Sequence, residues 1–433
     1  MYTDCWGETM LIGFVVAVFV AAYLLIIFSK FRRSVIAFSA GLILAFAKVF
    51  SDFSFERVGE LIDFNTIGLL IGMMIIVGVL RSSGFFHYAS VRVIRFSRGR
   101  IRLLIALILL TIGLFSALLD NVTTIILFAP ILFFIADITR KSPVQMTFAA
   151  IIAANIGGAA TLIGDPPNIL IGSASGLGFI DFLLAVGPIA MLMLLFIVIF
   201  MDLRVFRHFT DKSFRSSDIP SMDPSKAILS KKELKVSLAV FIIVLVGFAF
   251  HGVLGYEPSL IALAGAAAAL FLTGKGFSDI ASDVEWDTLL FFVGLFLLSS
   301  ALHVVGVSDV LSSALSAVAV HQTLFFILLL WITAVLSAFI GAVPTVAVLI
   351  PIMRTLTASH GIPIDIWWAI SIGACFGGSA TITGSAANMV GIGLMEKHMG
   401  TSVTYYQYLK FSLLPTLLVL LMGTLYISLR FAL

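Results

Sequence analysis

Two carboxylates stand in stretches of the sequence that are otherwise apolar. Asp165 lies within Gly164-Asp165-Pro166-Pro167-Asn168, near the middle of an apolar run from about 146 to 175, and Asp120 interrupts a second run from 103 to 137. Ionisable groups inside membrane segments are costly and usually functional. A buried carboxyl group can exchange a proton or bind a cation, so both are predicted to handle protons or cations.

The run that contains Asp165 cannot form one smooth helix. Pro166 and Pro167 lack N–H donors, and their rings clash with the preceding turn. We expect the first half to end at Gly157-Gly158 and the second to begin with Asp165 as its N-cap. Unwound backbone at this depth is tolerated only where protein or a watery cavity surrounds it. The motif therefore predicts a polar site inside a membrane protein.

A second, uncharged copy of this motif runs from Gly377 to Asn388. Its glycines, threonine and asparagine match the first copy at a constant offset of 220, whereas Ser385 replaces Asp165. The turn at Asp120 is matched by the turn at Gly341 to Thr345, again without a carboxylate. Four helix breaks, two from each half, are therefore predicted to form one polar pocket. Its predicted lining residues are Asp120, Asn121, Thr124, Thr161, Asp165, Asn168, Thr345, Thr381, Ser385 and Asn388.

The composition is that of a polytopic membrane protein. Of the 433 residues 61% are hydrophobic and 11% charged, with a mean hydropathy of +1.15, whereas soluble domains carry about 25% charged residues. The histidines and the cysteines Cys5 and Cys375 show no metal-ligand or disulfide spacing. The glycine-rich motif lacks the Gly-Lys-Ser/Thr of a phosphate-binding loop. We therefore expect no metal, no cofactor, no nucleic-acid partner and no enzymatic activity.

The chain divides into two matching halves. Residues 1–203 and 236–433 are each predicted to hold five crossings, one of them discontinuous, plus a hairpin-like block, and a polar cytoplasmic linker at 204–235 joins them. The blocks at 103–137 and 324–356 are either two full spans or re-entrant hairpins, so each half crosses an odd number of times. Odd repeats enter the membrane from opposite sides. The predicted fold is an all-α polytopic membrane protein of about 10 spans with two inverted-topology repeats, an architecture typical of secondary transporters.

The distribution of positive charge gives an orientation. If the N-terminus lies outside, 22 of the 26 Lys and Arg residues fall in predicted cytoplasmic segments. Cytoplasmic loops of membrane proteins carry an excess of these residues. Both termini are therefore predicted to lie outside.

At these motifs the chain resembles the ion transporter superfamily. The similar branch holds the arsenite-efflux permeases (ArsB), the NhaD-type sodium/proton antiporters and the P-protein-like members. The resemblance covers essentially the whole chain, and residues 286 to 315 are also similar to arsenite permeases. The residues that carry it are Leu119-Asp120-Asn121-Val122-Thr123-Thr124 with Pro130, Asn155 through Asn168, and Gly373 through Asn388.

The resemblance implies a scaffold and a mobile transport domain that work by an elevator-like movement. Because carboxylates at the site would repel a di- or tricarboxylate, a neutral or cationic substrate is favoured. The leading hypothesis is proton-coupled efflux of arsenite and antimonite across a prokaryotic inner membrane. The alternatives are a sodium/proton antiporter and a carboxylate or other anion transporter of the same superfamily; the inverted repeat disfavours a passive channel. Expected partners are the substrate, protons or sodium and membrane lipid, and the resemblance leaves open a homodimer and, as in some arsenite pumps, a soluble ATPase subunit.

Overall fold

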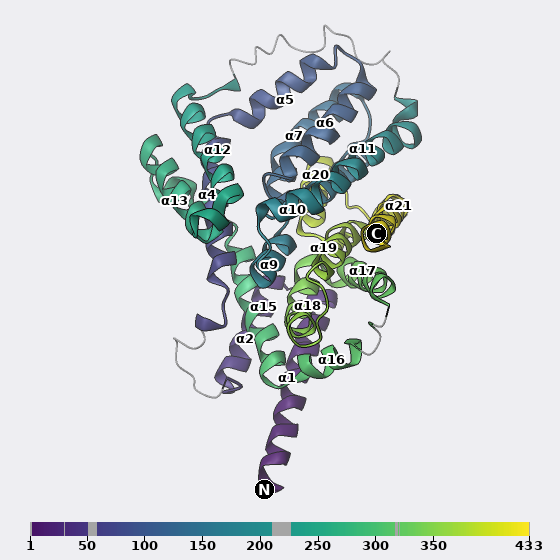
Figure 1. Cartoon of the computed structure of the whole chain (residues 1–433). Coiled ribbons are helices and arrows are strands. Elements are labelled where there is room, and N and C mark those ends of the chain that lie inside the picture. Colours follow the sequence, from purple (N-terminus) through teal and green to yellow (C-terminus); the bar gives the residue numbers. More distant parts are fainter. Residues whose placement is uncertain are drawn as a thin grey trace.

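The computed structural model describes residues 2–29, 31–50, 59–209, 227–316, 319 and 321–432, and within these ranges the regular structure is helical (Figure 1). The helices of the first repeat are α1 (Tyr2–Phe28), α2 (Arg33–Phe46), α4 (Phe64–Ser82), α5 (Phe85–Phe96), α6 (Ile101–Ser116), α7 (Asn121–Thr139), α8 (Val144–Gly158), α9 (Pro166–Ser175), α10 (Phe179–Ala185) and α11 (Gly187–Arg204). Those of the second are α12 (Lys231–Leu254), α13 (Pro258–Thr273), α14 (Phe277–Ile280), α15 (Trp286–Val304), α16 (Val307–Ser316), α17 (Gln322–Ile340), α18 (Ala342–Ser359), α19 (Ile366–Gly377), α20 (Ala386–Met399) and α21 (Tyr405–Ala432).

The helices bear out the predicted all-helical membrane fold. Within the described residues, 9 helices are long and apolar enough to cross a membrane, or up to 11 if each of two bent pairs counts as one span. The expected final crossing of the first repeat is divided into α10 and α11. The amphipathic helix α16 was not expected, and it stands after α15 as α5 stands after α4. Of the expected linker, residues 210–226 lie outside the described residues, and α12 already begins at Lys231.

Six helices, three from each repeat, form what we call the side group: α1, α2, α4, α12, α13 and α15. Within it the repeats exchange partners, because α2 packs on α15 and α4 packs on α13. Small residues allow both contacts: a Cβ on Gly294 would lie 2.3 Å from the Ala37 carbonyl carbon, and one on Gly72 would lie 2.6 Å from that of Ala262. Such close backbone approach is a common way for membrane helices to associate.

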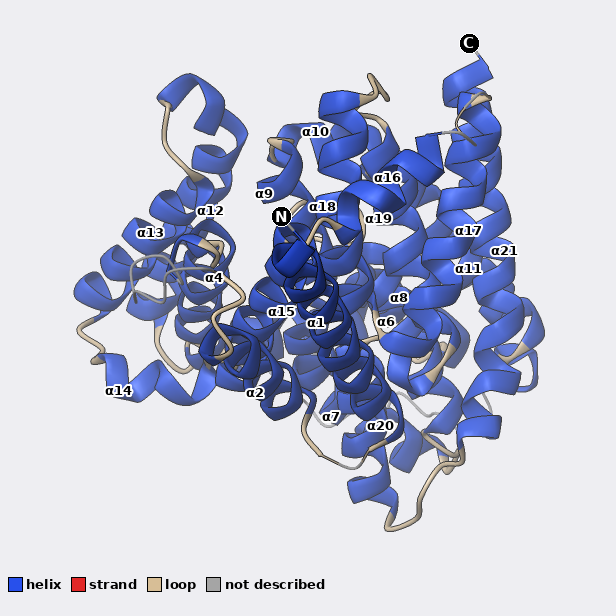
Figure 2. Ribbon diagram, turned by 90° about the horizontal axis from the view of Figure 1, so that it is seen from below, coloured by secondary structure: helices blue, strands red, loops and turns tan. Residues whose placement is uncertain are grey.

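Helices α6 to α11 and α17 to α21 form what we call the core group. Figure 2 shows α4, α12 and α13 on one side of the molecule and α11, α17 and α21 on the other. In the core group, α6 packs on α8 and α17 packs on α19, so each hairpin lies against the broken helix of its own repeat. The broken helices also cross the repeat boundary, since α20 packs on α7 and α8, and α9 packs on α18 and α19.

The two hairpins turn back beside the helix breaks. Helix α7 starts with Asp120 as N-cap, whose carboxylate accepts a hydrogen bond from the Thr123 N–H (2.7 Å). The second hairpin turns at Gly341 with φ +102°, a backbone conformation that residues with a Cβ rarely adopt. Each tip is hydrogen-bonded to the broken segment of its own repeat, which is the arrangement expected of a re-entrant hairpin.

Candidate functional site

Both broken helices make the same crossover, and glycines make it possible. After α8 the chain loops back so closely that a Cβ on Gly158 would lie 2.6 Å from the Gly164 carbonyl oxygen. After α19 the matching value is 2.8 Å, from a Cβ on Gly378 to the Gly384 oxygen. Real Cβ atoms do not come this close to backbone, so these positions require glycine. The next helices, α9 and α20, start from the crossover and point their first turns inward.

Hydroxyl groups fasten each hairpin tip to its break. Ser116 Oγ donates to the Ala154 carbonyl (2.7 Å), and Thr161 Oγ1 donates to the Ala117 carbonyl. In the second repeat, Ser337 Oγ donates to the Ala374 carbonyl (2.6 Å), and Thr381 Oγ1 donates to the Ala338 carbonyl. The two repeats therefore build the same joint with the same chemistry.

The two motif asparagines support the crossover from inside. Asn168 Nδ2 donates to the carbonyls of Ala159 (3.2 Å) and Thr161 (2.9 Å). Asn388 Nδ2 donates to the carbonyls of Gly378 (2.7 Å) and Thr381 (2.6 Å). These carbonyls lie at the break, outside the regular α-helices and inside the protein, where an unpaired polar group is costly.

The structure places all ten predicted residues at the tips and breaks, but it gives them different roles. The hydroxyls of Thr124 and Thr345 donate to carbonyls in the first turns of α7 and α18. Thr161, Thr381, Asn168 and Asn388 hold the backbone of the joints, as described above. Asp120 accepts from the Thr123 N–H, so seven of the ten side chains hold backbone groups. This leaves Asn121, Asp165 and Ser385, and the remaining oxygen of the Asp120 carboxylate, as the groups with the most freedom to act on a substrate.

Asn155, in α8, joins the two repeats. Its Oδ1 accepts from Asn121 Nδ2 (3.2 Å) and Ser385 Oγ (3.2 Å). Its Nδ2 donates to Ser379 Oγ (3.1 Å) and Asn388 Oδ1 (2.9 Å). Asn155 is fully buried, so its four hydrogen bonds tie the first hairpin and the second broken helix together.

Replacing Asn155 by alanine is expected to destabilise the protein. A buried polar group that loses its partner costs about 1–3 kcal/mol, and Asn155→Ala affects partners in both repeats. Thermal unfolding in detergent should show a clear fall in the midpoint. The matched control is Asn65→Ala, which removes a half-buried amide whose Oδ1 accepts one hydrogen bond from the Ser259 N–H inside the side group (3.1 Å). Equal midpoints for the two variants would mean that the four hydrogen bonds of Asn155 stabilise the protein no more than the single hydrogen bond of Asn65.

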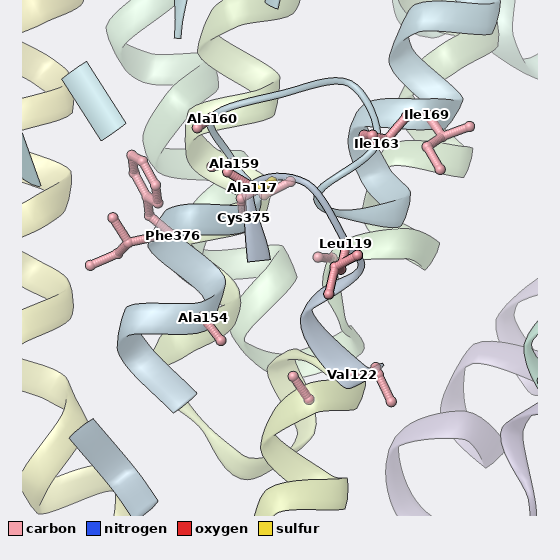
Figure 3. Close-up of a cluster of buried hydrophobic side chains, with 14 of the residues drawn as sticks. Ala117, Leu119, Val122, Ala154, Ala159, Ala160, Ile163, Ile169, Cys375 and Phe376 are labelled. Carbon is pink, nitrogen blue, oxygen red and sulfur yellow. The ribbon is translucent and has the colours of Figure 1, made fainter. Parts of the chain in front are cut away.

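Asp165 occupies the N-cap position of α9, but its side chain does not cap the helix. No amide of the first turn donates to it, so the cap expected from the sequence is wrong in this respect. Asp165 is 4% exposed, and its carboxyl group lies near the Cys375 thiol and the Asn121 side chain. Figure 3 draws buried apolar side chains of the first hairpin tip and the two broken helices, among them Ala117, Ala159 and Cys375. Asp165 is thus turned from its own helix toward the other repeat.

Cys375, which shows no metal-ligand or disulfide spacing in the sequence, is placed at the site by the structure. Its Sγ lies 3.6 Å from Asn168 Oδ1, which also accepts a hydrogen bond from Ser371 Oγ (2.7 Å). Cys375 matches Asn155 in the repeat register, so the charged break is faced by a thiol and the uncharged break by an amide. This soft, polarisable group stands beside the carboxyl group of Asp165.

Asp120 lies close to a second carboxylate, Glu285, which immediately precedes the span formed by α15. Burial and the negative charge of Asp120 together raise the pKa of Glu285 to about 7, and a hydrogen bond from Thr288 Oγ1 opposes this (2.8 Å). The tip of the first hairpin therefore lies within electrostatic range of a second carboxyl group at the edge of the side group.

Several contributing residues were missed from the sequence. Asn155 and Ser371 are polar residues in apolar helices that end at the glycine pairs, and Ser379 directly follows the second pair. That position was a usable signal. Tyr23 and Arg33 also reach the site, through hydrogen bonds to residues more than 300 positions away, and no local pattern marks such contacts. Among the described residues no group of three or more His, Cys, Asp or Glu side chains could hold a metal ion.

Comparisons with known proteins agree with this architecture. An uncharacterised transporter of Mycobacterium tuberculosis is 36% identical over 424 residues, which cover 96% of this chain and 98% of that protein. The human P protein is 30% identical over 469 residues, covering 88% of this chain and 56% of the P protein. The crystal structure of the Alcanivorax borkumensis YdaH transporter, which has an unusual topology, superimposes with a TM-score of 0.59 at 17% identity, covering 90% and 89% of the two chains.

The last of these likenesses shows the fold alone, whereas the family is shown by the sequence. Residues 23–373 match the family model CitMHS, described as citrate transporter. This agrees with the superfamily that the broken-helix motifs predicted. The chain is therefore a membrane transporter and belongs to the CitMHS citrate-transporter family.

Proposed function

We propose that this protein is a proton-coupled secondary transporter that exports arsenite and antimonite, with Asp165 as the coupling group. The observation that carries the proposal is the environment of the Asp165 carboxyl group. It is buried at the junction of the repeats and makes no capping hydrogen bond to its own helix. Its counterpart in the second repeat is the uncharged Ser385. A group that merely stabilised the break would be needed in both copies.

The chemistry of the junction supports a neutral, hydroxyl-bearing and soft substrate. Two carboxylates, Asp120 and Asp165, oppose a free anion. The amide of Asn121 and the hydroxyl of Ser385 can hydrogen-bond a small solute with several hydroxyl groups, and arsenous acid is such a solute. Cys375 adds a thiol, the ligand type that soft metals and metalloids prefer.

For movement, we propose that the core group shifts against the side group and carries the junction across the membrane. The few contacts between the groups, compared with the dense packing within each, support this. We further propose that the halves are residues 1–203 and 236–433, that the 204–235 linker is cytoplasmic, and that both termini face outward in a prokaryotic inner membrane. Labelling of single cysteines in the linker with an impermeant reagent, from inside or outside, tests the orientation.

The test of function is a flux assay in proteoliposomes with an imposed pH gradient. Arsenite and antimonite should move in the direction opposite to the protons. Cys375→Ser should weaken the apparent affinity for both solutes several-fold without removing the dependence of their flux on the pH gradient. The panel of tested solutes also includes citrate and sodium. If neither arsenite nor antimonite moves while one of these does, the substrate assignment is wrong and the coupling proposal is tested on that other solute. Flux that ignores the pH gradient would indicate a passive channel.

Citrate is the second candidate, because the matching family model is described as a citrate transporter. The two carboxylates then have to be neutralised, by protonation or by a cation that enters with the citrate. Citrate uptake that rises at low pH or with added divalent cation would favour this function. Sodium is the third member of the panel, and sodium-driven proton movement without any other solute would indicate a sodium/proton antiporter.

A further inference from the structure

Two side chains of the side group donate hydrogen bonds to the tips of the second repeat. Tyr23 Oη, from α1, donates to the Pro344 carbonyl at the start of α18 (3.1 Å), in a buried contact. Arg33 Nη1, from the first residue of α2, donates to the Thr383 carbonyl in the second break (3.0 Å). The same nitrogen lies close to Gly341, since a Cβ there would be 3.4 Å from it. Hairpin and break are thus both docked on one end of the side group.

The opposite end of the same interface is hollow. A cavity of about 360 Å³ separates the groups there, and its lining includes Asp63, Ser299 and Arg354. A second cavity of about 350 Å³ has Asn65 and His251 among its lining residues. Helices α2 and α15 run in parallel, since Arg32 pairs with Asp287 at their first turns, so Ser299 marks the far end. At that far end Ser299 Oγ donates to the Ala347 carbonyl of α18 (2.6 Å), so the groups also touch beside the cavity. Both tips of the second repeat, however, are held at the Arg33 end.

The inverted repeat provides no matching contact for the first-repeat tips. Ala37 and Ala262 take equivalent places in the side group, each against a glycine of the partner helix. They stand equally far into α2 and α13, so Pro258 is the counterpart of Arg33. Proline has neither an N–H nor a side-chain donor. The first-repeat tip instead lies within electrostatic range of the Glu285 carboxyl group.

We infer that Tyr23 and Arg33 are positioning residues that hold the core group in the docked conformation and favour it over the opposite one. This inference rests on the proposed movement of the core group, but not on the identity of the substrate. Exchange of conformations between the repeats would present the first-repeat tips to α13, where the donor is missing. The transport cycle is therefore energetically asymmetric, with one docked state that must be released.

The test measures the distance between the groups without any substrate. Nitroxide labels are placed on exposed positions, Val253 of α12 and Leu203 of α11, in a full-length background with Cys5 and Cys375 replaced by serine. Pulsed electron resonance then gives the distribution of distances. Arg33→Met is expected to raise the ratio of the undocked to the docked population about tenfold, the effect of losing one charged hydrogen bond. Tyr23→Phe should add a smaller rise, and Arg33→Lys should restore most of the docked population.

Two control variants and one control label pair separate release from general loosening. Arg32→Met removes an ion pair that lies within the side group, with Asp287 (2.8 Å). Tyr426→Phe removes a hydroxyl-to-carbonyl bond within the core group, to Ala185 (2.6 Å). Neither should change the populations. Labels on Leu203 and the exposed Leu421, both in the core group, should keep one distance in every variant.

Each result bears on one claim only. An unchanged Val253–Leu203 distribution in the double variant Tyr23→Phe/Arg33→Met, with the core pair intact, overturns the positioning role. A shift in both label pairs also overturns it, because it shows loosening of the core group itself. If the positioning variants release the core group but no solute of the flux panel moves, the inference stands and the proposed substrate is lost.

Discussion

Asp165→Asn is expected to abolish pH-driven arsenite transport and to leave the protein folded. Asparagine has nearly the same size and can stay beside Cys375 and Asn121, but it cannot bind or release a proton. Because the carboxyl side chain caps no helix, removing its charge takes no support from α9. Proteoliposomes with the variant should therefore show no flux above that of empty liposomes under a pH gradient. Exchange of labelled for unlabelled arsenite at equal pH should persist.

The control is Asp137→Asn, which changes a mostly exposed carboxylate near the end of α7, 3.4 Å from His398. This variant should transport like the wild type, so that a loss in Asp165→Asn cannot be ascribed merely to the removal of one negative charge. Full pH-driven transport by Asp165→Asn would remove this residue from coupling and leave Asp120 as the candidate. Loss of the exchange reaction as well would assign Asp165 to substrate binding instead.

The breaks were predictable because their causes are local. Pro166 and Pro167 exclude a continuous helix from the sequence alone, and the second copy is recognisable from Gly377 to Asn388. The hairpin tips followed from Asp120, whose capping bond to Thr123 spans only three residues. The constant offset between the matching motifs then indicated that both halves meet at one junction. This is why the predicted fold agrees with the structure.

The use made of each side chain was not predictable in the same way. Thr161 was expected to line a pocket, yet its hydroxyl is engaged by the Ala117 carbonyl, a partner 44 positions away. The amide of Asn155 has four partners drawn from both repeats, and its importance follows only from their arrangement in space. Asp165 shows the opposite case, since a favourable capping position is left unused. Competing partners decide such matters, and the sequence does not say which partner wins.

Gly157→Ala is expected to be among the most damaging single changes outside the charged groups. A Cβ on Gly157 would lie 2.0 Å from the Gly113 carbonyl oxygen and 2.5 Å from its carbon, so helices α8 and α6 touch through backbone. Neither atom can turn away as a side chain can. Forcing extra atoms into a packed interior typically costs about 1–3 kcal/mol and sometimes more, and a backbone contact belongs at the upper end. The thermal midpoint in detergent should fall sharply, and pH-driven transport should be lost.

Transport should fall further than the fraction of unfolded protein alone would explain. The reason is that the displaced helices hold the hydrogen bonds between the hairpin tip and the break. If α6 moves away from α8, the bonds from Ser116 to Ala154 and from Thr161 to Ala117 lengthen together. Gly377→Ala should behave alike, since its Cβ would lie 2.4 Å from the Ala334 oxygen. The control is Gly393→Ala in α20, where a Cβ meets nothing within 4 Å and alanine favours the helix by about 1 kcal/mol. A Gly157→Ala protein as stable and active as this control would show that the hairpin and the broken helix need no such close contact.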